Sequence, residues 1–240
     1  MLVAGLTGGI ATGKSTASSL FKSHSVVVVD ADVISRQVVL PGTRAHSQIV
    51  THFGKEILLP DGSLDRPKLG AVIFGDEQKR RQLNSIVHPA VRRAMLWQVI
   101  KGWVRGERFC IIDVPLLIET GLHKWIGSVI VVSCSEEMQL KRLMARDKST
   151  EDAAMSRIRS QLPISVKASY ADVVIDNDGE LSELDGQVHN IVEKLKEETK
   201  WTWACEWLVP PLGLFAAVFT VSVRAATRWA KQNTYHQKKN

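Results

Sequence analysis

The first twenty-one residues contain the feature that most constrains this chain. An apolar run at residues 2–6 precedes a glycine-rich loop, and apolar residues then recur at helical spacing from Ala17 to Phe21. The loop consists of Gly8, Gly9, Ile10, Ala11, Thr12, Gly13, Lys14, Ser15 and Thr16. It fits the pattern G-x-x-x-x-G-K-S/T, in which backbone N–H groups cradle phosphates, the lysine reaches the β- and γ-phosphates, and the hydroxyl binds Mg²⁺. We therefore predict a strand, a phosphate loop and a helix, with an ATP or GTP site at their junction.

The context of the loop supports this prediction. Glycine allows the backbone to approach a phosphate closely, and the N-terminus of the next helix favours an anion by roughly 0.3–1 kcal/mol. A glycine-rich turn with a chance lysine is the alternative. It leaves the preceding strand and the following helix unexplained.

Length and charge narrow the class of protein. The chain has 240 residues, of which 45% are hydrophobic, which suits one substantial α/β domain with an appendage. The formal charge is +6, but five basic residues against one acidic residue after Lys200 account for +4 of it. The body has no basic stripe interleaved with aromatic residues, so we do not expect it to bind nucleic acid.

The cysteines and the N-terminal residues indicate the cellular compartment in which the protein works. Cys110, Cys134 and Cys205 are isolated, odd in number and without metal-binding spacing. This favours a reducing compartment over a disulfide framework. The strand at the start leaves no room for a signal or transit peptide, so we expect a cytoplasmic catalytic domain.

Short apolar runs alternate with helical patterns along residues 1–200. We expect five strands, at residues 2–6, 26–29, 109–113, 129–132 and 172–177. Such continuous runs are typical of strands buried on both faces of a parallel sheet. The helical crossovers predict an α/β fold with a doubly wound parallel sheet of five strands, closed by a helix from Leu181 to Glu198.

Carboxylates follow two of these strands. Asp30 and Asp32 come after residues 26–29, and Asp113 ends the run at 109–113. Ligands bind beyond the carboxyl ends of the strands in an open parallel sheet, so we expect these side chains to project toward the phosphate loop. Asp113 fits an acid that orders Mg²⁺ or its water shell. Asp32 fits either a functional carboxylate or the N-cap of the next helix.

The connection between the second and third strands is longer than an ordinary crossover. Residues from Pro41 to about Gly106 show helical patterns, with start signals at Asp65 and Pro67. We expect this insertion to carry substrate specificity. His88 lies within it and fits a substrate contact, a core position or a cap.

A further helix is expected after the fourth strand. Ser133 and Glu136 have the spacing of a capping box that opens residues 136–145. Arg142 and Arg146 lie four residues apart and therefore share one face of this helix. Paired arginines there either neutralise charge on a transferring phosphoryl group or form a solvated face.

Taken together, these motifs resemble the dephospho-CoA kinase family over residues 1–200. The motifs occur in the family's order: Gly5-Leu6-Thr7-Gly8-Gly9-Ile10-Ala11-Thr12-Gly13-Lys14-Ser15, Asp30-Ala31-Asp32 with Arg36, Val87-His88-Pro89, Asp113-Val114-Pro115-Leu116-Leu117-Ile118-Glu119, Gln139-x-x-Arg142-x-x-x-Arg146, and Asp172 to Asn177. A phosphate loop alone fits many enzymes, whereas this set is much more specific. Thr12, where serine is commoner, and Ile118, where an aromatic residue is common, are small departures that remove no catalytic group.

The resemblance implies a P-loop kinase. Such an enzyme transfers the γ-phosphoryl group of ATP to the ribose 3′-hydroxyl of dephospho-CoA, giving CoA and ADP in the last step of CoA synthesis. Mg²⁺ is the implied cofactor. A helical acceptor-binding insertion is implied at about residues 35–106, and a helical lid at about residues 136–165.

The same resemblance implies a role for each matching residue. Asp32 would accept the proton of the attacking hydroxyl. The ATP phosphates would be held by Lys14 and the rest of Gly8 to Thr16, with Ser15 and Asp113 on the metal and Arg142 and Arg146 clamping from the lid. Gln161 and Asn177 would approach the adenine side. The residues implied on the acceptor side are Asp32, Arg36, His88 and Leu116.

Residues 201–240 have no counterpart in this resemblance. Residues 207–223 carry no charge, with tryptophans on both sides and a basic C-terminal end. A spanning helix needs about 20 apolar residues, range roughly 17–25, and the prolines and glycine at 210, 211 and 213 weaken this one. We expect a membrane anchor, on mitochondria or the endoplasmic reticulum. There are two alternatives: an interfacial or partner-binding helix, and a segment folded onto the kinase domain. Association with the preceding CoA-pathway enzyme is a further hypothesis.

Two other functions compete with this one. The first is another phosphate-loop kinase that acts on a nucleotide or nucleoside. The second is a nucleotide-dependent switch or a membrane scaffold. A GTPase switch should carry an N-K-x-D motif and a D-x-x-G motif after the third strand, and neither is present, since Asp113 is followed by Val-Pro-Leu. A degenerate scaffold should have lost Lys14, Asp32 or the arginines, which are present.

Overall fold

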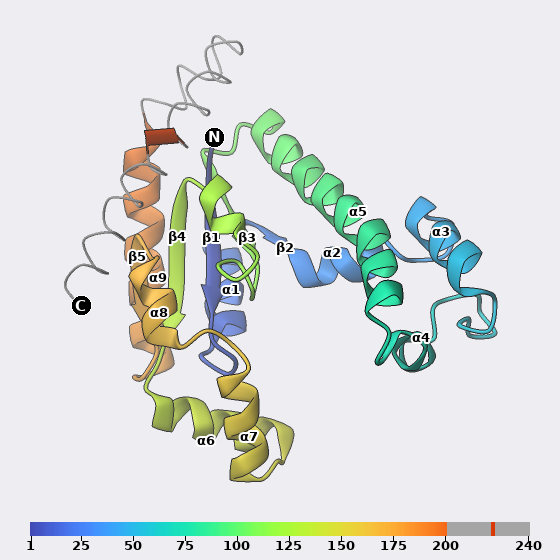
Figure 1. Ribbon diagram of the computed structural model, residues 1–240. Helices are drawn as coiled ribbons and strands as arrows, with labels where there is room; N and C mark the ends of the chain where they lie inside the picture. The colour runs from blue at the N-terminus through green and yellow to red at the C-terminus, as the bar shows by residue number, and fades with distance from the viewer. Residues whose placement is uncertain (201–221, 224–240) are drawn as a thin grey trace. The chain divides into compact units, whose positions relative to one another are not determined.

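The predicted strands form one sheet. In the computed structural model, which describes residues 1–200 together with Ser222 and Val223, the strand order is β2-β3-β1-β4-β5 (Figure 1). The strands are β1 Leu2–Gly8, β2 Val27–Asp30, β3 Phe109–Asp113, β4 Ser128–Ser133 and β5 Val173–Asp176. β1 pairs in parallel with β3 and β4, and β4 pairs in parallel with β5. The predicted α/β fold with a five-stranded parallel sheet is confirmed.

β1 lies between β3 and β4, so the loop after β1 is flanked by the ends of two strands. Leu6 lies opposite Asp113 of β3 and Ile130 of β4, and Gly8 lies opposite Val132. Parallel strands end at the same edge of a sheet, which is where ligands bind in open α/β folds. This register therefore places the phosphate loop and Asp113 at one edge.

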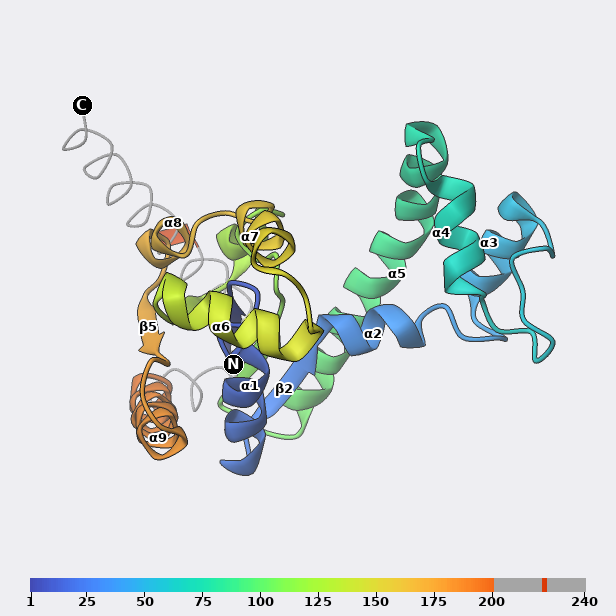
Figure 2. The ribbon, with the colours of Figure 1, turned by 90° about the horizontal axis from the view of Figure 1, so that it is seen from below.

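Helices cover both faces of the sheet. The helices on the faces are α1 Lys14–Ser23, α8 Ile164–Ser169 and α9 Leu181–Glu198. Helices α6 Glu136–Asp147 and α7 Glu151–Arg159 lie beyond the ends of the strands (Figure 1), and Leu122–Trp125 forms a 3₁₀ turn. Figure 2 shows α1 and α9 on one face and α8 on the other. Phe21 of α1 and Val188 of α9 share a buried core with Leu6 and Ile130 of the strands. This core fixes where β1 ends and α1 begins, and so fixes the loop between them.

The chain divides into two compact units. Among residues 1–200, the first combines Met1–Val29 with residues 102–200, and the second is Asp30–Lys101. The helices of the second unit are α2 Ala31–Gln37, α3 Arg44–Phe53, α4 Arg66–Ile73 and most of α5 Glu77–Val104. It has its own apolar cluster, which includes Ile49, Leu69 and Ile86.

Local signals account for some of the helix boundaries. The Asp65 side chain accepts a hydrogen bond from the N–H of Lys68 and caps α4, with Pro67 in the first turn. Pro is tolerated there because the N–H that it lacks has no partner in the first turn of a helix.

The capping box predicted at Ser133 is wrong. Ser133 is the last residue of β4, and α6 starts only at Glu136. The N-cap is therefore Ser135, whose hydroxyl accepts a hydrogen bond from the N–H of Met138 at 3.4 Å. Helix α8 was not predicted at all, because six residues are too few to show a helical period.

The predicted membrane segment, residues 207–223, lies outside the described residues apart from Ser222 and Val223. Within the part of the chain that the structure describes, no helix is both long enough and apolar enough to cross a bilayer.

Candidate active site

The phosphate loop is the tight turn between β1 and α1. Gly13 caps α1 with a left-handed backbone, at φ 90°, which glycine adopts without a steric penalty. Ala11 also has a positive φ, of 59°. The N–H and the hydroxyl of Thr12 both donate to the carbonyl of Gly9, at 3.3 and 2.9 Å. These bonds close the turn directly in front of the helix.

Side chains from outside the loop hold its carbonyl groups. Gln139 Nε2, on α6, donates to the carbonyl of Ile10 at 2.7 Å, and Asn177 Nδ2 donates to the carbonyl of Thr12 at 2.8 Å. A trans peptide group points its C=O and the following N–H in opposite directions. The N–H groups of Ala11 and Gly13 therefore point away from these donors. Backbone N–H groups that are left available in this way can contribute to an anion-binding cradle.

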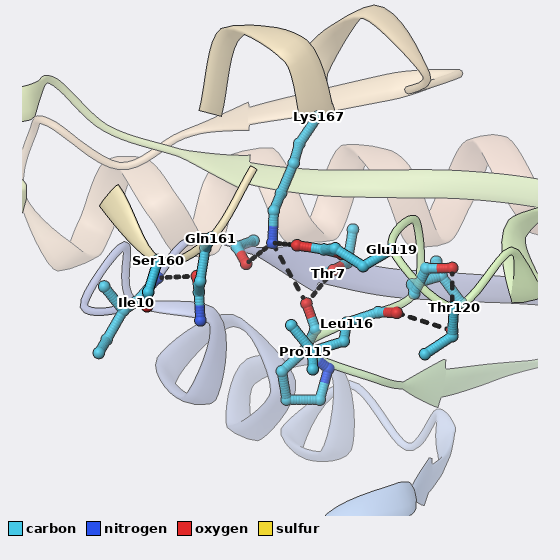
Figure 3. Close-up of polar contacts among 12 residues, drawn as sticks. Thr7, Ile10, Pro115, Leu116, Glu119, Thr120, Ser160, Gln161 and Lys167 are labelled. Atoms are coloured by element: carbon cyan, nitrogen blue, oxygen red, sulfur yellow. Dashed lines mark hydrogen bonds and ion pairs between the residues drawn. The ribbon is translucent and has the colours of Figure 1, made fainter. Parts of the chain in front are cut away.

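Gln161 holds the same part of the loop. Its Oε1 accepts a hydrogen bond from the N–H of Ile10 at 3.0 Å (Figure 3). Both backbone groups of Ile10 are thus bound, one by Gln139 and one by Gln161. Gln139 and Asn177 are buried. The adenine-side roles of Gln161 and Asn177 stay predictions, since the contacts seen here are to the loop itself.

Lys14 and Asp113 connect the ends of two elements. Lys14 Nζ, at the start of α1, forms an ion pair with Asp113 Oδ1, at the end of β3. Asp113 is buried, whereas Ser15 is exposed on the first turn of α1. The ion pair with Asp113 thus holds the Lys14 ammonium group beside the loop.

The oxygen atoms of this site suit Mg²⁺. Mg²⁺ prefers hard oxygen ligands, keeps several waters, and is usually bound by one or two carboxylates plus substrate phosphates. The Ser15 hydroxyl and the Asp113 carboxylate match that chemistry. In residues 1–200, no group of three or more His, Cys, Asp or Glu side chains could hold a metal. The donor set therefore fits a metal that arrives with a nucleotide rather than one held in a protein cage.

The two predicted arginines bind different partners. Arg142 Nη1 donates to the carbonyl of Asn177 at 2.8 Å, and the side chain of Asn177 in turn holds Thr12. Arg146 Nε lies 2.8 Å from Asp147 Oδ1, and Arg157 Nη1 lies 2.6 Å from Asp147 Oδ2. The hydrogen bond from Arg146, together with the charges of Arg146 and Arg157, holds the pKa of Asp147 below its ordinary value.

A pocket of about 270 Å³ lies beside the loop. Its lining residues come from the loop, α6, α7 and the segment before α8, and are Gly9, Glu136, Gln139, Met155, Ile158, Arg159, Gln161, Leu162, Pro163 and Ile164. Small-molecule sites usually measure about 300–1,000 Å³. The pocket therefore suits part of a nucleotide whose phosphates lie on the loop.

Comparisons with known proteins identify the family. A family model described as dephospho-CoA kinase matches residues 2–183. A dephospho-CoA kinase from Arabidopsis thaliana is 44% identical over 201 residues, covering 84% of this chain and 87% of that protein. One from Oceanobacillus iheyensis is 47% identical over 194 residues, covering 80% of this chain and 97% of that protein. This chain belongs to the dephospho-CoA kinase family. It uses ATP to phosphorylate the ribose 3′-hydroxyl of dephospho-CoA, the final step of CoA biosynthesis.

Solved structures agree with this fold. The dephospho-CoA kinase from Campylobacter jejuni is 27% identical with a TM-score of 0.64, over 82% of this chain and 98% of its own. TT1252 from Thermus thermophilus is 26% identical with a TM-score of 0.68, over 81% of this chain and 97% of its own. Both proteins align over nearly their whole length, so the kinase fold lies within the shared part.

The residues predicted on the acceptor side of this kinase lie mostly in the second unit. Asp32 is exposed in the first turn of α2, and Arg36 and His88 are also exposed. Leu116, which is 43% exposed, follows β3 in the first unit. Their contacts with dephospho-CoA stay predictions.

The structural roles that the sequence also allowed for Asp32 and His88 are wrong. Asp30, not Asp32, caps α2, because Asp30 Oδ1 accepts hydrogen bonds from the N–H groups of Asp32 and Val33 at 2.9 and 3.0 Å. His88 is exposed in the interior of α5, so it is neither a core residue nor a cap. Both residues remain candidates for contact with a ligand.

Sequence reasoning missed one buried cation of the kinase. Lys167 was not singled out, because a lysine in a short polar segment normally lies in solvent. The side chain is in fact fully buried beside the phosphate loop. No local signal in the sequence distinguishes it from an exposed lysine.

Proposed function

We propose that the loop Gly8 to Thr16 binds the ATP phosphates of this kinase. The observation that supports this is the pair of side-chain donors on the carbonyls of Ile10 and Thr12, which leaves the N–H groups of Ala11 and Gly13 for an anion. Lys14 adds a positive charge by exchanging Asp113 for the β- and γ-phosphates. Phosphoryl transfer depends mainly on such positioning and on charge stabilisation.

We assign the Mg²⁺ ligands to Ser15 and Asp113. When bound, Mg²⁺ neutralises charge that develops on the phosphates. The ion pair between Lys14 and Asp113 supports a coupled role for the two residues. Once Lys14 turns to the phosphates, the Asp113 carboxylate becomes free to orient the metal or its water shell.

The remaining roles follow from the same proposal. Asp32 accepts the proton of the 3′-hydroxyl, while Arg36, His88 and Leu116 hold the acceptor. Arg142 and Arg146 bind the transferring phosphoryl group, a kind of contact worth about 10³–10⁵ in rate for an arginine finger. Arg142 is already linked to the loop through Asn177, whereas Arg146 first has to release Asp147. Gln161 and Asn177 also border the adenine.

The test is ADP release with Mg-ATP and one of three acceptors: dephospho-CoA, adenosine or AMP. Both the full chain and a fragment of residues 1–200 are measured. We expect stimulation by dephospho-CoA alone and equal turnover by the two proteins. Equal turnover with adenosine or AMP would contradict the acceptor specificity, and activity confined to the full chain would show that the tail takes part in the reaction.

We further propose that residues 201–240 bring the kinase to a membrane. The uncharged stretch at 207–223, with its tryptophans and basic end, supports this proposal. In a flotation experiment with vesicles, the full chain should rise with the lipid and the fragment 1–200 should not. If the full chain stays with the soluble fraction, membrane binding is contradicted, and the tail either binds a partner or folds onto the kinase domain. Co-purification with the preceding CoA-pathway enzyme then tests the first of these alternatives.

A further inference from the structure

Lys167 of α8 is a buried cation in the kinase core. Its side chain is completely shielded from solvent, and no other lysine or arginine in residues 1–200 is buried. Burying a charge is costly unless the charge is paired and hydrogen-bonded. Something in the fold therefore has to compensate for the burial of this ammonium group.

Three oxygen atoms surround the ammonium group of Lys167. Its Nζ lies 2.8 Å from Glu119 Oε1, 3.1 Å from the carbonyl oxygen of Gly8 and 3.4 Å from that of Pro115 (Figure 3). A lysine ammonium has three N–H donors and no acceptor. The three acceptors therefore match its three donors, and Glu119 balances its charge.

These acceptors belong to the two loops that form the nucleotide site. Gly8 is the first glycine of the phosphate loop, and Pro115 follows Asp113 at the end of β3. The hydroxyl of Thr7 also donates to the carbonyl of Pro115, at 2.9 Å. Lys167 thus ties together the loop that presents Lys14 and the strand end that presents Asp113.

Lys167 extends the pattern of donors on the phosphate loop. Lys167, Gln139 and Asn177 donate to the carbonyls of Gly8, Ile10 and Thr12, which are every second residue. Each donor turns the following N–H to the opposite side of the chain. Because Lys167 is buried, it cannot touch a nucleotide, and any effect on one must pass through these backbone groups.

We propose that Lys167, neutralised by Glu119, is a positioning residue that holds the phosphate loop in its nucleotide-binding conformation. This inference rests on the proposed role of the loop as the ATP phosphate site. Loss of Lys167 leaves the carbonyl of Gly8 without this side-chain donor and Glu119 without its counter-ion, while the carbonyl of Pro115 keeps only the hydrogen bond from Thr7. The first peptide of the loop can then rotate, and the aligned N–H groups are lost before ATP binds.

The test compares Lys167→Met and Glu119→Gln with the unmodified full chain. We measure the Kd of ADP by calorimetry, and kcat and KM for both substrates. Lys167→Met should raise the Kd of ADP by about ten- to a hundredfold, as expected for loss of hydrogen bonds to a charged group. The KM for dephospho-CoA should stay within about twofold. Glu119→Gln keeps an acceptor but removes the charge, so its Kd should rise less, by about three- to tenfold.

Val188→Ala is the matched control. Val188 is fully buried in the core between α9 and the sheet and contacts no loop carbonyl. The substitution should lower stability without changing the Kd of ADP. An unchanged Kd of ADP in folded Lys167→Met, or an equal rise in Val188→Ala, would overturn the positioning role. If Lys167→Met does not fold, the Kd of ADP of Glu119→Gln is compared with those of the unmodified chain and Val188→Ala, and an unchanged value overturns the positioning role.

The two proposals fail differently. If Gly13→Ala, a change in the loop itself, leaves the Kd of ADP unchanged, the proposed role of the loop as the phosphate site fails. If Gly13→Ala raises the Kd of ADP while the Kd values of Lys167→Met, Glu119→Gln and the unmodified chain agree, only the role of Lys167 fails.

Discussion

At the scale of single residues, the two carboxylates after β2 have separate tasks. Asp30 caps α2, because its Oδ1 accepts hydrogen bonds from the N–H groups of Asp32 and Val33, and this fixes the orientation of its carboxylate. Asp32 lies two residues later with an exposed side chain. A general base has to be free to accept a proton, and only Asp32 of this pair meets that requirement.

Replacing Asp32 tests its proposed role as the base. Asp32→Asn should leave the Kd of ADP within about twofold and lower kcat by about 10²–10⁴, the usual contribution of a positioned general base. The measurements are steady-state turnover with dephospho-CoA and ADP binding by calorimetry.

Asp30→Ala serves as the control for Asp32→Asn. It should cost about 0.5–2 kcal/mol of stability by removing the cap of α2. A parallel loss of ADP affinity in Asp32→Asn would assign this carboxylate to the metal rather than to the hydroxyl.

At the scale of elements, the junction between the phosphate loop and α1 has no room for a side chain. Gly13 has a φ of 90°, and a Cβ built on it would collide with Nδ2 of Asn177. Asn177 is the residue that holds the Thr12 carbonyl. Position 13 therefore requires glycine for two reasons: the backbone has a positive φ, and a side chain would collide with Asn177.

Gly13→Ala should disrupt the loop by both routes. The strained backbone costs of order 1 kcal/mol or more, and displacement of Asn177 removes the donor to Thr12. We expect the Kd of ADP to rise at least tenfold and the thermal unfolding temperature to fall. Gly186→Ala, inside α9 with open space around its Cβ position, is the control and should stabilise by about 0.5–1 kcal/mol. Full ADP affinity in Gly13→Ala would contradict this account of the loop.

Arginines from helices α6 and α7 bind the same carboxylate, that of Asp147. Asp147 binds both Arg146 of α6 and Arg157 of α7, and its lowered pKa keeps the carboxylate ionised to more acidic pH than an ordinary aspartate. The Asp147 carboxylate therefore keeps its charge at neutral pH and stays available to both arginines. Arg146 can therefore reach a phosphoryl group only by exchanging one anion for another.

At the scale of the whole molecule, burial of Cys110 in β3 makes stability depend on alkaline pH. Burial raises the pKa of the Cys110 thiol from 9.0 to about 12. In the unfolded chain the thiol ionises near its ordinary pKa, whereas the folded chain keeps the proton. Between about pH 9 and 12 the unfolded state therefore binds fewer protons, and the free energy of unfolding falls as pH rises.

Cys110→Val should remove this contribution. We expect the free energy of unfolding to fall less steeply between pH 8 and 10 in the variant than in the unmodified chain. Denaturant unfolding at several pH values provides the measurement, and Cys134 is present in both proteins. Identical slopes would show that the thiol does not titrate differently in the two states.

Much of the fold was predictable from local patterns. Each strand is a short apolar run, and the helix Leu181–Glu198 has an apolar stripe that packs on the core, so burial and periodicity suffice to find them. The starts of helices were less predictable where two nearby polar residues could each serve as the N-cap. Ser135 caps α6 instead of Ser133, and Asp30 caps α2 instead of Asp32, because the cap depends on where the preceding strand ends.

By itself, the sequence determined the phosphate loop, the order of the strands and of the helices other than α8, and the family, because glycine spacing, apolar runs and short motifs are local properties. Only the tertiary structure decided which side chains support the loop. Gln139, Lys167 and Asn177 lie more than a hundred residues from the phosphate-loop carbonyls that they bind. Their meeting depends on how α6, α8 and the end of β5 pack around β1. No local pattern encodes such packing, so a lysine that looks exposed in the sequence becomes a buried support of the site.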